Sequence, residues 1–372
     1  MATDLETRIE GGDAAPARPG LKITGLHIRG LKSIRSLDLP EDGLGWNGEI
    51  PDFVMVGGIN GSGKTTFLEF LVSVFEQTEQ FSPAHQSVTA RVPNALNASE
   101  ATVDFGFSPG GPVNRTIRFV IGNQNFVEHN KTTNWFGFVE QANLMNGRWL
   151  ASCGSLSPEL PLVAQIAKWR IPSREISGPP GVVYFPSERR TLISPPTNHK
   201  FAGKLSSRYK FVERWQPPEQ WNDSLEARLY GIRWEDLNAK EEGRELEANG
   251  FEAYSRSFDR FFDGRRRLKW DHGELVVETK SGVVHDLSEL SSGEKQVILF
   301  MGELLHRWRP GSLILIDEPE LHLHESYQTR LWEALVDWQK ERGGQVFLAT
   351  QSSHLFRLAH SAMKVVLSRQ SL

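Results

Sequence analysis

Cysteine is nearly absent from this sequence, whose 372 residues include only Cys153. A single cysteine excludes an intramolecular disulfide framework and any multi-cysteine zinc or iron–sulfur site, and it indicates a reducing compartment. Long apolar runs are also missing, because none approaches the ~20 residues that are needed to cross a bilayer. We therefore expect a cytoplasmic protein with no membrane partner.

An excess of basic charge is missing as well. Lys and Arg number 42 against 46 Asp and Glu, which gives a net charge of −4. This balance excludes a globally basic nucleic-acid binder, although a local basic groove is compatible with it. Residues 1–20 lack an apolar segment and are rich in Ala, Pro and Gly. Such a segment is typical of a disordered tail and not of a signal peptide.

The sequence does contain short apolar runs that alternate with segments of helical periodicity. Residues 21–28 and 33–39 are predicted to form a β-hairpin around Arg29 and Gly30. Further strands are predicted at 53–56, 101–107, 116–121, 182–185, 275–278, 283–287, 313–316 and 345–349. Helices are predicted from Lys64, after Ser292, at 327–340 and near 355. This alternation favours an α/β fold with a mainly parallel sheet.

The segment from 199 to 268 differs from both flanks. It is rich in Arg, Lys, Glu and Trp, has few β-branched residues and is predicted to be a helical lobe. We therefore divide the chain into a tail (1–20), the N-terminal half of one domain (21–198), this inserted lobe (199–268) and the C-terminal half (269–372).

A phosphate-binding loop is predicted between the strand at 53–56 and the helix that follows. Residues 58–65 read GINGSGKT and satisfy the pattern G-x-x-x-x-G-K-[ST]. Glycines let the backbone N–H groups point at phosphate oxygens, Lys64 can reach the β and γ phosphates, and Thr65 can hold Mg²⁺. The predicted nucleotide-binding residues of this loop are Asn60, Gly61, Ser62, Gly63, Lys64, Thr65 and Thr66.

Two adjacent carboxylates end the apolar run at 313–316. Asp317 and Glu318 would lie at the carboxyl end of a strand, where ligands bind in open α/β sheets. Asp317 is predicted to hold Mg²⁺ together with Thr65, and Glu318 to orient or deprotonate an attacking water.

A second anion-binding helix start is predicted at Ser291, Ser292, Gly293 and Glu294. Ser-Ser-Gly-Glu alone is also a common helix N-cap. One nucleotide needs only one cradle of this kind. The presence of two in one chain therefore indicates that the second contacts the γ-phosphate of a nucleotide bound by another subunit.

Together these motifs resemble those of the ABC-type ATPases of the SMC, RecF and OLD-like group. GGINGSGKTT resembles their Walker A loop, LSSGEKQ their signature motif, and LILIDEPELHLH their Walker B strand and D-loop. The opening LKITGLHIRGLKSIRSLDL resembles their N-terminal hairpin, and VVYFPSERR recurs in the group. Lys32 and Ser33 of this hairpin are assigned to the nucleotide site as well.

The resemblance implies a P-loop fold with an N-terminal antiparallel β-subdomain and an inserted helical lobe. It also implies a homodimer in which two ATP molecules lie between one chain's Walker motifs and the other chain's Ser291. The predicted activity is ATP hydrolysis with Mg²⁺, which drives or gates a separate effector, a nuclease or toxin, in antiphage defence or DNA maintenance. The alternatives are an ATP-locked scaffold with slow turnover and a transporter nucleotide-binding subunit. The interval from Lys64 to Ser291 is longer than in compact transporter modules.

The sequence departs from the group at two places. Gln351 occupies the position where these ATPases usually have a histidine, and a glutamine cannot carry the positive charge, so slow hydrolysis is expected. His354 is an alternative. The glutamine of the Q-loop can be Gln141 or Gln165.

Two further groups have a functional and a structural interpretation. His322 and His324 would share a face of a strand and suggest a metal site, but a D-loop role at the dimer interface is favoured. A basic helical stripe would fit either contact with DNA or RNA or a solvated face of the lobe. Its members are Lys200, Lys204, Arg208, Lys210 and Arg214, and Arg265, Arg266 and Arg267 invite the same two interpretations.

Overall fold

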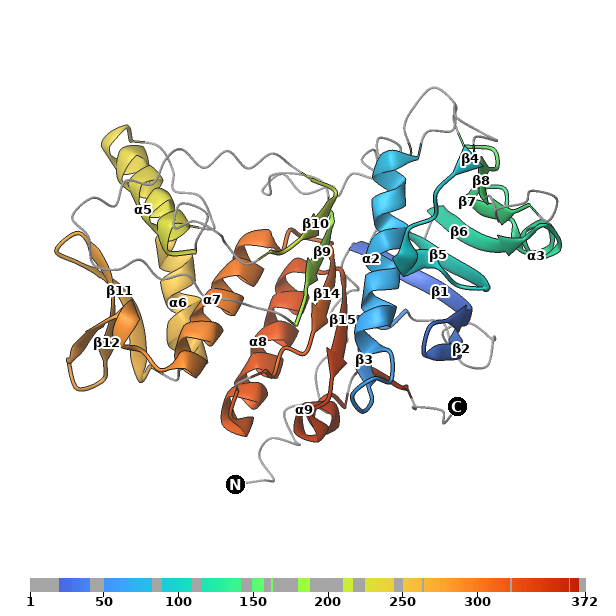
Figure 1. Ribbon diagram of the computed structural model, residues 1–372. Helices are drawn as coiled ribbons and strands as arrows, with labels where there is room; N and C mark the ends of the chain where they lie inside the picture. The colour runs from blue at the N-terminus through green and yellow to red at the C-terminus, as the bar shows by residue number, and fades with distance from the viewer. Residues whose placement is uncertain are drawn as a thin grey trace, which may run out of the picture.

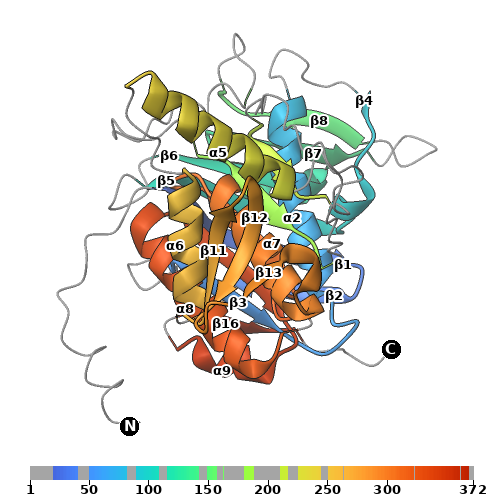
Figure 2. The same ribbon diagram turned by 90° about the vertical axis from the view of Figure 1, so that its left-hand side faces the viewer.

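The fold is described from a computed structural model. It describes residues 20–40, 50–81, 89–108, 115–141, 149–156, 162, 180–187, 210–216, 225–243, 250–262, 264–321, 323–360 and 362–367. Its described parts form three sheets, with helices packed against them (Figures 1 and 2).

A six-stranded sheet forms the centre of the molecule. Its strand order is β10-β9-β14-β15-β3-β16, and all of its neighbouring strands are parallel. The strands are β3 (Phe53–Gly57), β9 (Val182–Phe185), β10 (Val212–Arg214), β14 (Leu313–Asp317), β15 (Gln345–Thr350) and β16 (Met363–Val366). The prediction of a mainly parallel sheet is confirmed.

Alternate residues of these strands enter two separate apolar cores. In β3, Val54 and Val56 face one core, while Phe53 and Met55 face the other. The same alternation occurs in β9, β14 and β15. Because both faces of the sheet are covered, its strands are nearly continuous apolar runs, as expected for a parallel sheet.

Helix α2 (Lys64–Gln80) covers one face of the central sheet and separates it from a second sheet (Figure 1). This second, seven-stranded sheet has the order β2-β1-β5-β6-β7-β8-β4 and is antiparallel except where β6 meets β7. Its strands are β1 (Gly20–Leu31), β2 (Ile34–Leu39), β4 (Thr89–Ala90), β5 (Glu100–Ser108), β6 (Arg115–Asn123), β7 (Trp135–Glu140) and β8 (Trp149–Cys153). Helix α3 (Gln124–Asn130) and a 3-10 turn at Asn94–Leu96 connect strands of this sheet.

The other face of the central sheet is covered by helices and a small antiparallel sheet, β11-β12-β13 (Figures 1 and 2). The elements are α5 (Leu225–Glu241), α6 (Phe251–Phe261), β11 (Arg266–Asp271), β12 (Glu274–Thr279), β13 (Val284–Asp286), a 3-10 turn (Leu287–Glu289), α7 (Ser292–Arg307), α8 (Glu325–Arg342) and α9 (Ser353–Leu358). Apolar residues of α7 and α8 enter this second core.

A fully buried glutamine joins the two large sheets. Ile23 of β1 donates its backbone N–H to the Gln345 side-chain oxygen over 2.8 Å. The Gln345 side-chain nitrogen donates to the Pro51 carbonyl over 2.8 Å. A buried amide is stable only when its hydrogen bonds are made. Gln345 therefore fixes β1 against the start of β15, which the apolar pattern alone did not predict.

The strands predicted before residue 199 are confirmed, but the hairpin turns at a different place. Leu31 pairs with Ile34, so the turn consists of Lys32 and Ser33 and not of Arg29 and Gly30. Arg29 instead lies within β1, where its guanidinium binds Asp38 of β2 over 2.7 Å. None of the helices in the described parts of the chain is long and apolar enough to cross a membrane.

The helical stripe predicted in the lobe is wrong at its C-terminal end. Lys210 precedes β10 and Arg214 lies in it, whereas Lys200, Lys204 and Arg208 lie outside the described residues. The spacing of four suggested a helix, yet the buried Phe211 and Val212 extend the central sheet by one strand. The remainder of the lobe includes the helices α5 and α6, and the division into domains stays a prediction.

The two charged residues of β10 reach opposite faces of the central sheet. Arg214 binds Glu69 and Glu76 of α2, each over 2.5 Å. Glu213 forms an ion pair with Arg307 of α7. Neighbouring residues of a strand point to opposite sides, so this short edge strand contacts both layers of helices.

A buried ion pair joins α5 to α7. Arg228 binds Glu303 over 2.6 Å, and their side chains are 11% and 5% exposed. Arg307 also contacts this carboxylate, over 2.9 Å. Burial raises the pKa of Glu303, and the neighbouring Arg228 opposes that rise.

We expect Arg228→Ala to lower the free energy of unfolding by about 3 kcal/mol, because it removes one partner of a buried pair. Without Arg228 the pKa of Glu303 rises further, so the loss is largest where this carboxyl is ionised and decreases as the pH falls. Denaturant unfolding at neutral and at mildly acidic pH measures both effects. Arg256→Ala removes an exposed pair with Glu252 and should cost about 0.5 kcal/mol or less. Equal losses in the two variants would contradict the assignment.

Candidate functional site

The ends of three neighbouring strands bring the predicted site together. Ala349 of β15 is in register with Val56 of β3 on one side and with Asp317 of β14 on the other. Because the strands are parallel, the segments that follow them leave the sheet at the same edge. These segments are the loop at 58–63, Glu318 with its turn, and residues 351–352.

The predicted phosphate loop turns through left-handed backbone at two glycines. Gly61 and Gly63 have φ values of 78° and 103°. A Cβ on Gly63 would lie 2.7 Å from the Ser33 Oγ and 2.8 Å from the Ile34 Cγ1, whereas a Cβ on Gly61 would meet nothing within 4 Å. The hairpin turn that contains Lys32 and Ser33 therefore lies directly against the loop. Asn60 and Ser62 belong to the loop, and Thr65 and Thr66 to the first turn of α2.

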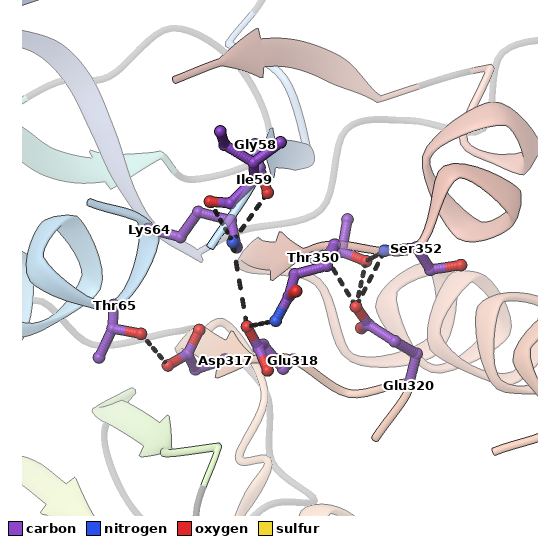
Figure 3. Close-up of polar contacts among 10 residues, drawn as sticks. Gly58, Ile59, Lys64, Thr65, Asp317, Glu318, Glu320, Thr350 and Ser352 are labelled. Carbon is purple, nitrogen blue, oxygen red and sulfur yellow. Dashed lines mark hydrogen bonds and ion pairs between the residues drawn. The ribbon is translucent and has the colours of Figure 1, made fainter. Parts of the chain in front are cut away.

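The side chain of Lys64 folds back against the start of the loop. Its side chain is 4% exposed, and its Nζ lies 3.9 Å from the Glu318 Oε1. The same Nζ donates to the carbonyl oxygens of Gly58, over 2.8 Å, and Ile59, over 3.2 Å (Figure 3). The ammonium group is thus held between the loop and the carboxylate that follows β14.

Thr65 and Asp317 are also in contact. The Thr65 hydroxyl donates to the Asp317 Oδ2 over 2.6 Å, and Asp317 is fully buried (Figure 3). The contact joins the first turn of α2 to the end of β14. Both residues were predicted to hold Mg²⁺, and the structure brings them together.

Glu318 adopts left-handed backbone at the end of β14. Its φ is 47°, and its backbone N–H donates to the Ala349 carbonyl over 2.8 Å. The Gln351 side-chain amide donates to the Glu318 Oε1. The two predicted catalytic residues therefore touch. His354, the alternative, forms a hydrogen bond of 2.9 Å with Thr329 of α8.

One acidic residue beside the site was not predicted from the sequence. The Glu320 Oε1 accepts hydrogen bonds from the Thr350 hydroxyl, over 2.7 Å, and from the backbone N–H groups of Gln351, over 2.7 Å, and Ser352, over 3.1 Å (Figure 3). The only signal in the sequence was a third acid, two residues after Glu318.

The predicted signature motif forms the start of α7. Ser291 is the N-cap residue and forms a capping box with Glu294. The Ser291 N–H and hydroxyl both donate to the Glu294 Oε2, over 3.0 and 2.8 Å. The Glu294 Oε1 binds Arg266 of β11 over 2.6 Å. Glu294 is thus engaged within its own chain, while Ser291 is exposed.

The two helix starts lie on opposite sides of the central sheet. The buried apolar residues of α2, among them Phe67 and Leu71, belong to one core. Those of α7, among them Val297 and Leu304, belong to the other. Ser292 and Gly293 lie in the first turn of α7. The two predicted anion-binding helix starts therefore belong to different layers.

Of the other predicted candidates, the two that lie within the described residues, His324 and Gln141, have no described contact with the site. His324 caps α8 by accepting from the Ser326 N–H over 3.3 Å, and it does not lie on a strand. Gln141 follows β7 of the seven-stranded sheet, whereas His322 and Gln165 lie outside the described residues. Within the described ranges, no group of three His, Cys, Asp or Glu residues could hold a metal ion.

The arrangement fits a nucleoside triphosphate with Mg²⁺. A hydroxyl and a carboxylate, on Thr65 and Asp317, are the oxygen ligands that Mg²⁺ prefers beside substrate phosphates. The loop leaves open space around Gly61 and is followed by the N-terminus of α2, a helix of 17 residues. Such a helix start favours phosphate groups.

Comparison with known proteins finds one matching family and several similar solved structures. Residues 187–357, a little under half of the chain, match the family described as "AAA domain, putative AbiEii toxin, Type IV TA system". No curated protein matches the sequence. The match includes Asp317, Glu318, Ser291 and Gln351 and leaves the phosphate loop outside it.

Solved structures of SMC head domains are similar over most of their length. The SMC head domain from Thermotoga maritima is 15% identical, with 91% of this chain and 92% of that chain covered and a TM-score of 0.41. A second is the Smc head domain with an extended coiled coil, bound to the C-terminal domain of ScpA derived from Pyrococcus furiosus. It is also 15% identical, with 91% of this chain and 92% of that chain covered and a TM-score of 0.42.

Replacement of the loop glycines tests the close contact with the hairpin turn. Gly63→Ala and Gly61→Ala both place a Cβ on left-handed backbone, at a cost of roughly 1 kcal/mol each. Only the Cβ of Gly63→Ala would also push the side chains of Ser33 and Ile34 away from the loop. We therefore expect Gly63→Ala to lower the melting temperature of the nucleotide-free protein by several degrees more than Gly61→Ala. Equal melting temperatures would contradict the contact.

Proposed function

We propose that this chain, an ABC-type ATPase with an AAA domain, binds ATP with Mg²⁺, hydrolyses it, and dimerises around two ATP molecules. One observation carries the proposal: Lys64, Thr65, Asp317 and Glu318 meet at one edge of the parallel sheet. Each of them is a residue type that the chemistry of phosphoryl transfer to water requires.

Different residues would bind the phosphates and the Mg²⁺ ion. The backbone N–H groups of residues 60–65 would hold the phosphate oxygens. The Lys64 ammonium would leave the carbonyls of Gly58 and Ile59 and bind the β and γ phosphates. Thr65 and Asp317 would hold Mg²⁺, which when bound neutralises the charge on these phosphates. Ser33 lies against Gly63 of the loop, and Ser33 and Lys32 are both proposed to contact the nucleotide.

Glu318 would act on the attacking water. Its side chain is 14% exposed, so part of it is accessible to water. Gln351 donates to the Oε1 and fixes the orientation of the carboxylate. A glutamine holds Glu318 without adding a positive charge, and slow turnover is therefore part of the proposal.

The position of α7 supports a dimer. Ser291 is exposed at a helix start that lies across the sheet from Lys64 of its own chain. A nucleotide in the phosphate loop would therefore meet the Ser291 of a second copy. Ser292 and Gly293 would add backbone N–H groups, as expected at the start of a helix.

We further propose that the dimer drives or gates a separate effector. The description of the matching family includes a toxin of a type IV toxin–antitoxin system, which favours a defence role over DNA maintenance. Contact with DNA or RNA through the lobe has less support than the sequence suggested, because Arg214 is neutralised by Glu69 and Glu76.

Two substitutions separate binding from hydrolysis. Lys64→Ala should weaken ATP binding by roughly 100-fold, because it removes a charge-assisted contact to phosphate. Glu318→Gln should keep the affinity for ATP but lower kcat by about 10²-fold to 10⁴-fold, the usual contribution of a general base. Calorimetry with ATP and Mg²⁺ and a phosphate-release assay measure the two effects. Unchanged hydrolysis in both variants would contradict an ATPase at this site.

The glutamine at position 351, where related ATPases have a histidine, also supports a second function. This function is an ATP-locked scaffold in which turnover is incidental. The same Glu318→Gln variant decides between the two. If effector activity or assembly persists after hydrolysis is lost, ATP serves as a clamp. If activity is lost together with hydrolysis, the chain is a motor.

The dimer is tested at the signature motif. Ser291→Arg places a bulky cation where the second nucleotide would dock and should abolish ATP-induced dimerisation. ATP binding by the monomer should remain within about threefold. Light scattering with ATP in the Glu318→Gln background measures the dimer, and Ser291→Ala, which loses the cap but adds no bulk, serves as the control. Loss of ATP binding together with dimerisation would contradict the two-chain site.

A further inference from the structure

Glu320 is placed where it can control the predicted catalytic pair. The chain turns sharply after β14, and this turn is closed by hydrogen bonds from the Leu321 N–H to the Glu318 carbonyl, over 3.2 Å, and from the Leu323 N–H to the Glu320 carbonyl, over 2.8 Å. As a result, Glu318 and Glu320 both face the segment that follows β15. Figure 3 shows both carboxylates directed toward the segment that contains Thr350 and Ser352.

One oxygen of Glu320 holds the whole segment 350–352. The Oε1 accepts from the Thr350 hydroxyl and from the N–H groups of Gln351 and Ser352. The Ser352 N–H also donates to the Thr350 Oγ1 over 2.9 Å. Hydrogen bonds to an ionised acceptor are stronger than those between neutral groups. Three of them on one carboxylate oxygen fix the local backbone.

The anchored segment continues into the helical layer. The Ser352 hydroxyl donates to the Gln328 Oε1 of α8 over 2.5 Å and accepts from the Leu355 N–H over 3.1 Å. The Gln328 amide in turn donates to the Leu323 carbonyl over 2.9 Å. The segment is therefore tied to both ends of the turn that bears Glu320.

Gln351 has fewer restraints than its two neighbours. Thr350 is buried at the end of β15 and Ser352 is the N-cap residue of α9, but Gln351 is exposed. Its described hydrogen bonds run from its N–H to Glu320 and from its side-chain amide to Glu318. The contact on Glu318 thus depends on where Glu320 holds the backbone of Gln351.

We infer that Glu320 is a positioning residue, which holds Gln351 and through it fixes the carboxylate of Glu318. This inference rests on the proposed ATPase function. Glu320 itself touches neither Lys64 nor the loop in the contacts described. Its loss should therefore act on turnover and leave ATP binding unchanged.

Steady-state kinetics and ATP affinity of three variants test this role. Glu320→Ala should lower kcat about 10-fold to 100-fold, the range for residues that support a catalytic group from behind. The Kd for ATP with Mg²⁺ should stay within about threefold. Glu320→Gln keeps an acceptor oxygen and should recover part of the loss. Glu325→Ala removes an exposed carboxylate from the start of α8 and should leave kcat within about twofold; a loss as large as that of Glu320→Ala would contradict the inference.

The double variant separates positioning from general stabilisation. If Glu320 acts through Gln351, Glu320→Ala should change kcat by less than about threefold when Gln351 is already Ala. A purely structural role would instead give the same loss in both backgrounds, together with weaker ATP binding. That result would overturn the inference.

A readout without nucleotide keeps the test independent of the proposed function. Hydrogen exchange of the Gln351 and Ser352 N–H groups should accelerate at least tenfold in Glu320→Ala, with exchange in β14 and β15 unchanged. Unchanged exchange at these two groups would overturn the inference even if the wild type lacked ATPase activity. Conversely, hydrolysis that is unaffected by Lys64→Ala would refute the proposed function. The exchange result would then still test whether Glu320 holds the backbone of Gln351 and Ser352.

Discussion

The site depends on the parallel register of three neighbouring strands. With β15 between β3 and β14, Ala349 is level with both Val56 and Asp317, and everything that follows these strands emerges at one edge. Parallel strands in this arrangement require cover on both faces, and the two apolar cores supply it. The alternation of side chains builds the cores, and the parallel register of the strands brings Lys64 and Asp317, which are remote in sequence, to the same edge.

Much of this arrangement could be predicted, because the signals are local. A buried strand is an apolar run, a phosphate loop needs glycines at fixed positions, and Asp317 and Glu318 end a strand whose neighbours are parallel. The contacts of Glu320 and of Arg266 could not be predicted. Each joins a charged side chain to a segment that is distant in the sequence, and only the assembled fold determines which of many charges meet.

Strand β10 shows why the charge pattern misled. Its charged residues and the spacing of basic residues before it suggested a helix face. In the fold, Glu213 and Arg214 lie on the edge strand of the central sheet, and each forms an ion pair with the helical layer on its own side. In a strand of three residues, the alternation of apolar side chains is too short to be recognised in the sequence. The spacing of the basic residues therefore dominated the prediction. The pairing of β10 with β9 is decided by the buried Phe211 and Val212.

The two cores also decide how a nucleotide site can be completed. Helix α2 and helix α7 are each packed into one core, with the same rigid sheet between them. To bring Ser291 to the Lys64 of its own chain, one helix would have to leave its core, at a cost of many buried apolar side chains. To bring Ser291 to the phosphate loop of a second chain, neither helix would have to leave its core. Under the proposed function, bound ATP would therefore favour association of two chains over rearrangement of one.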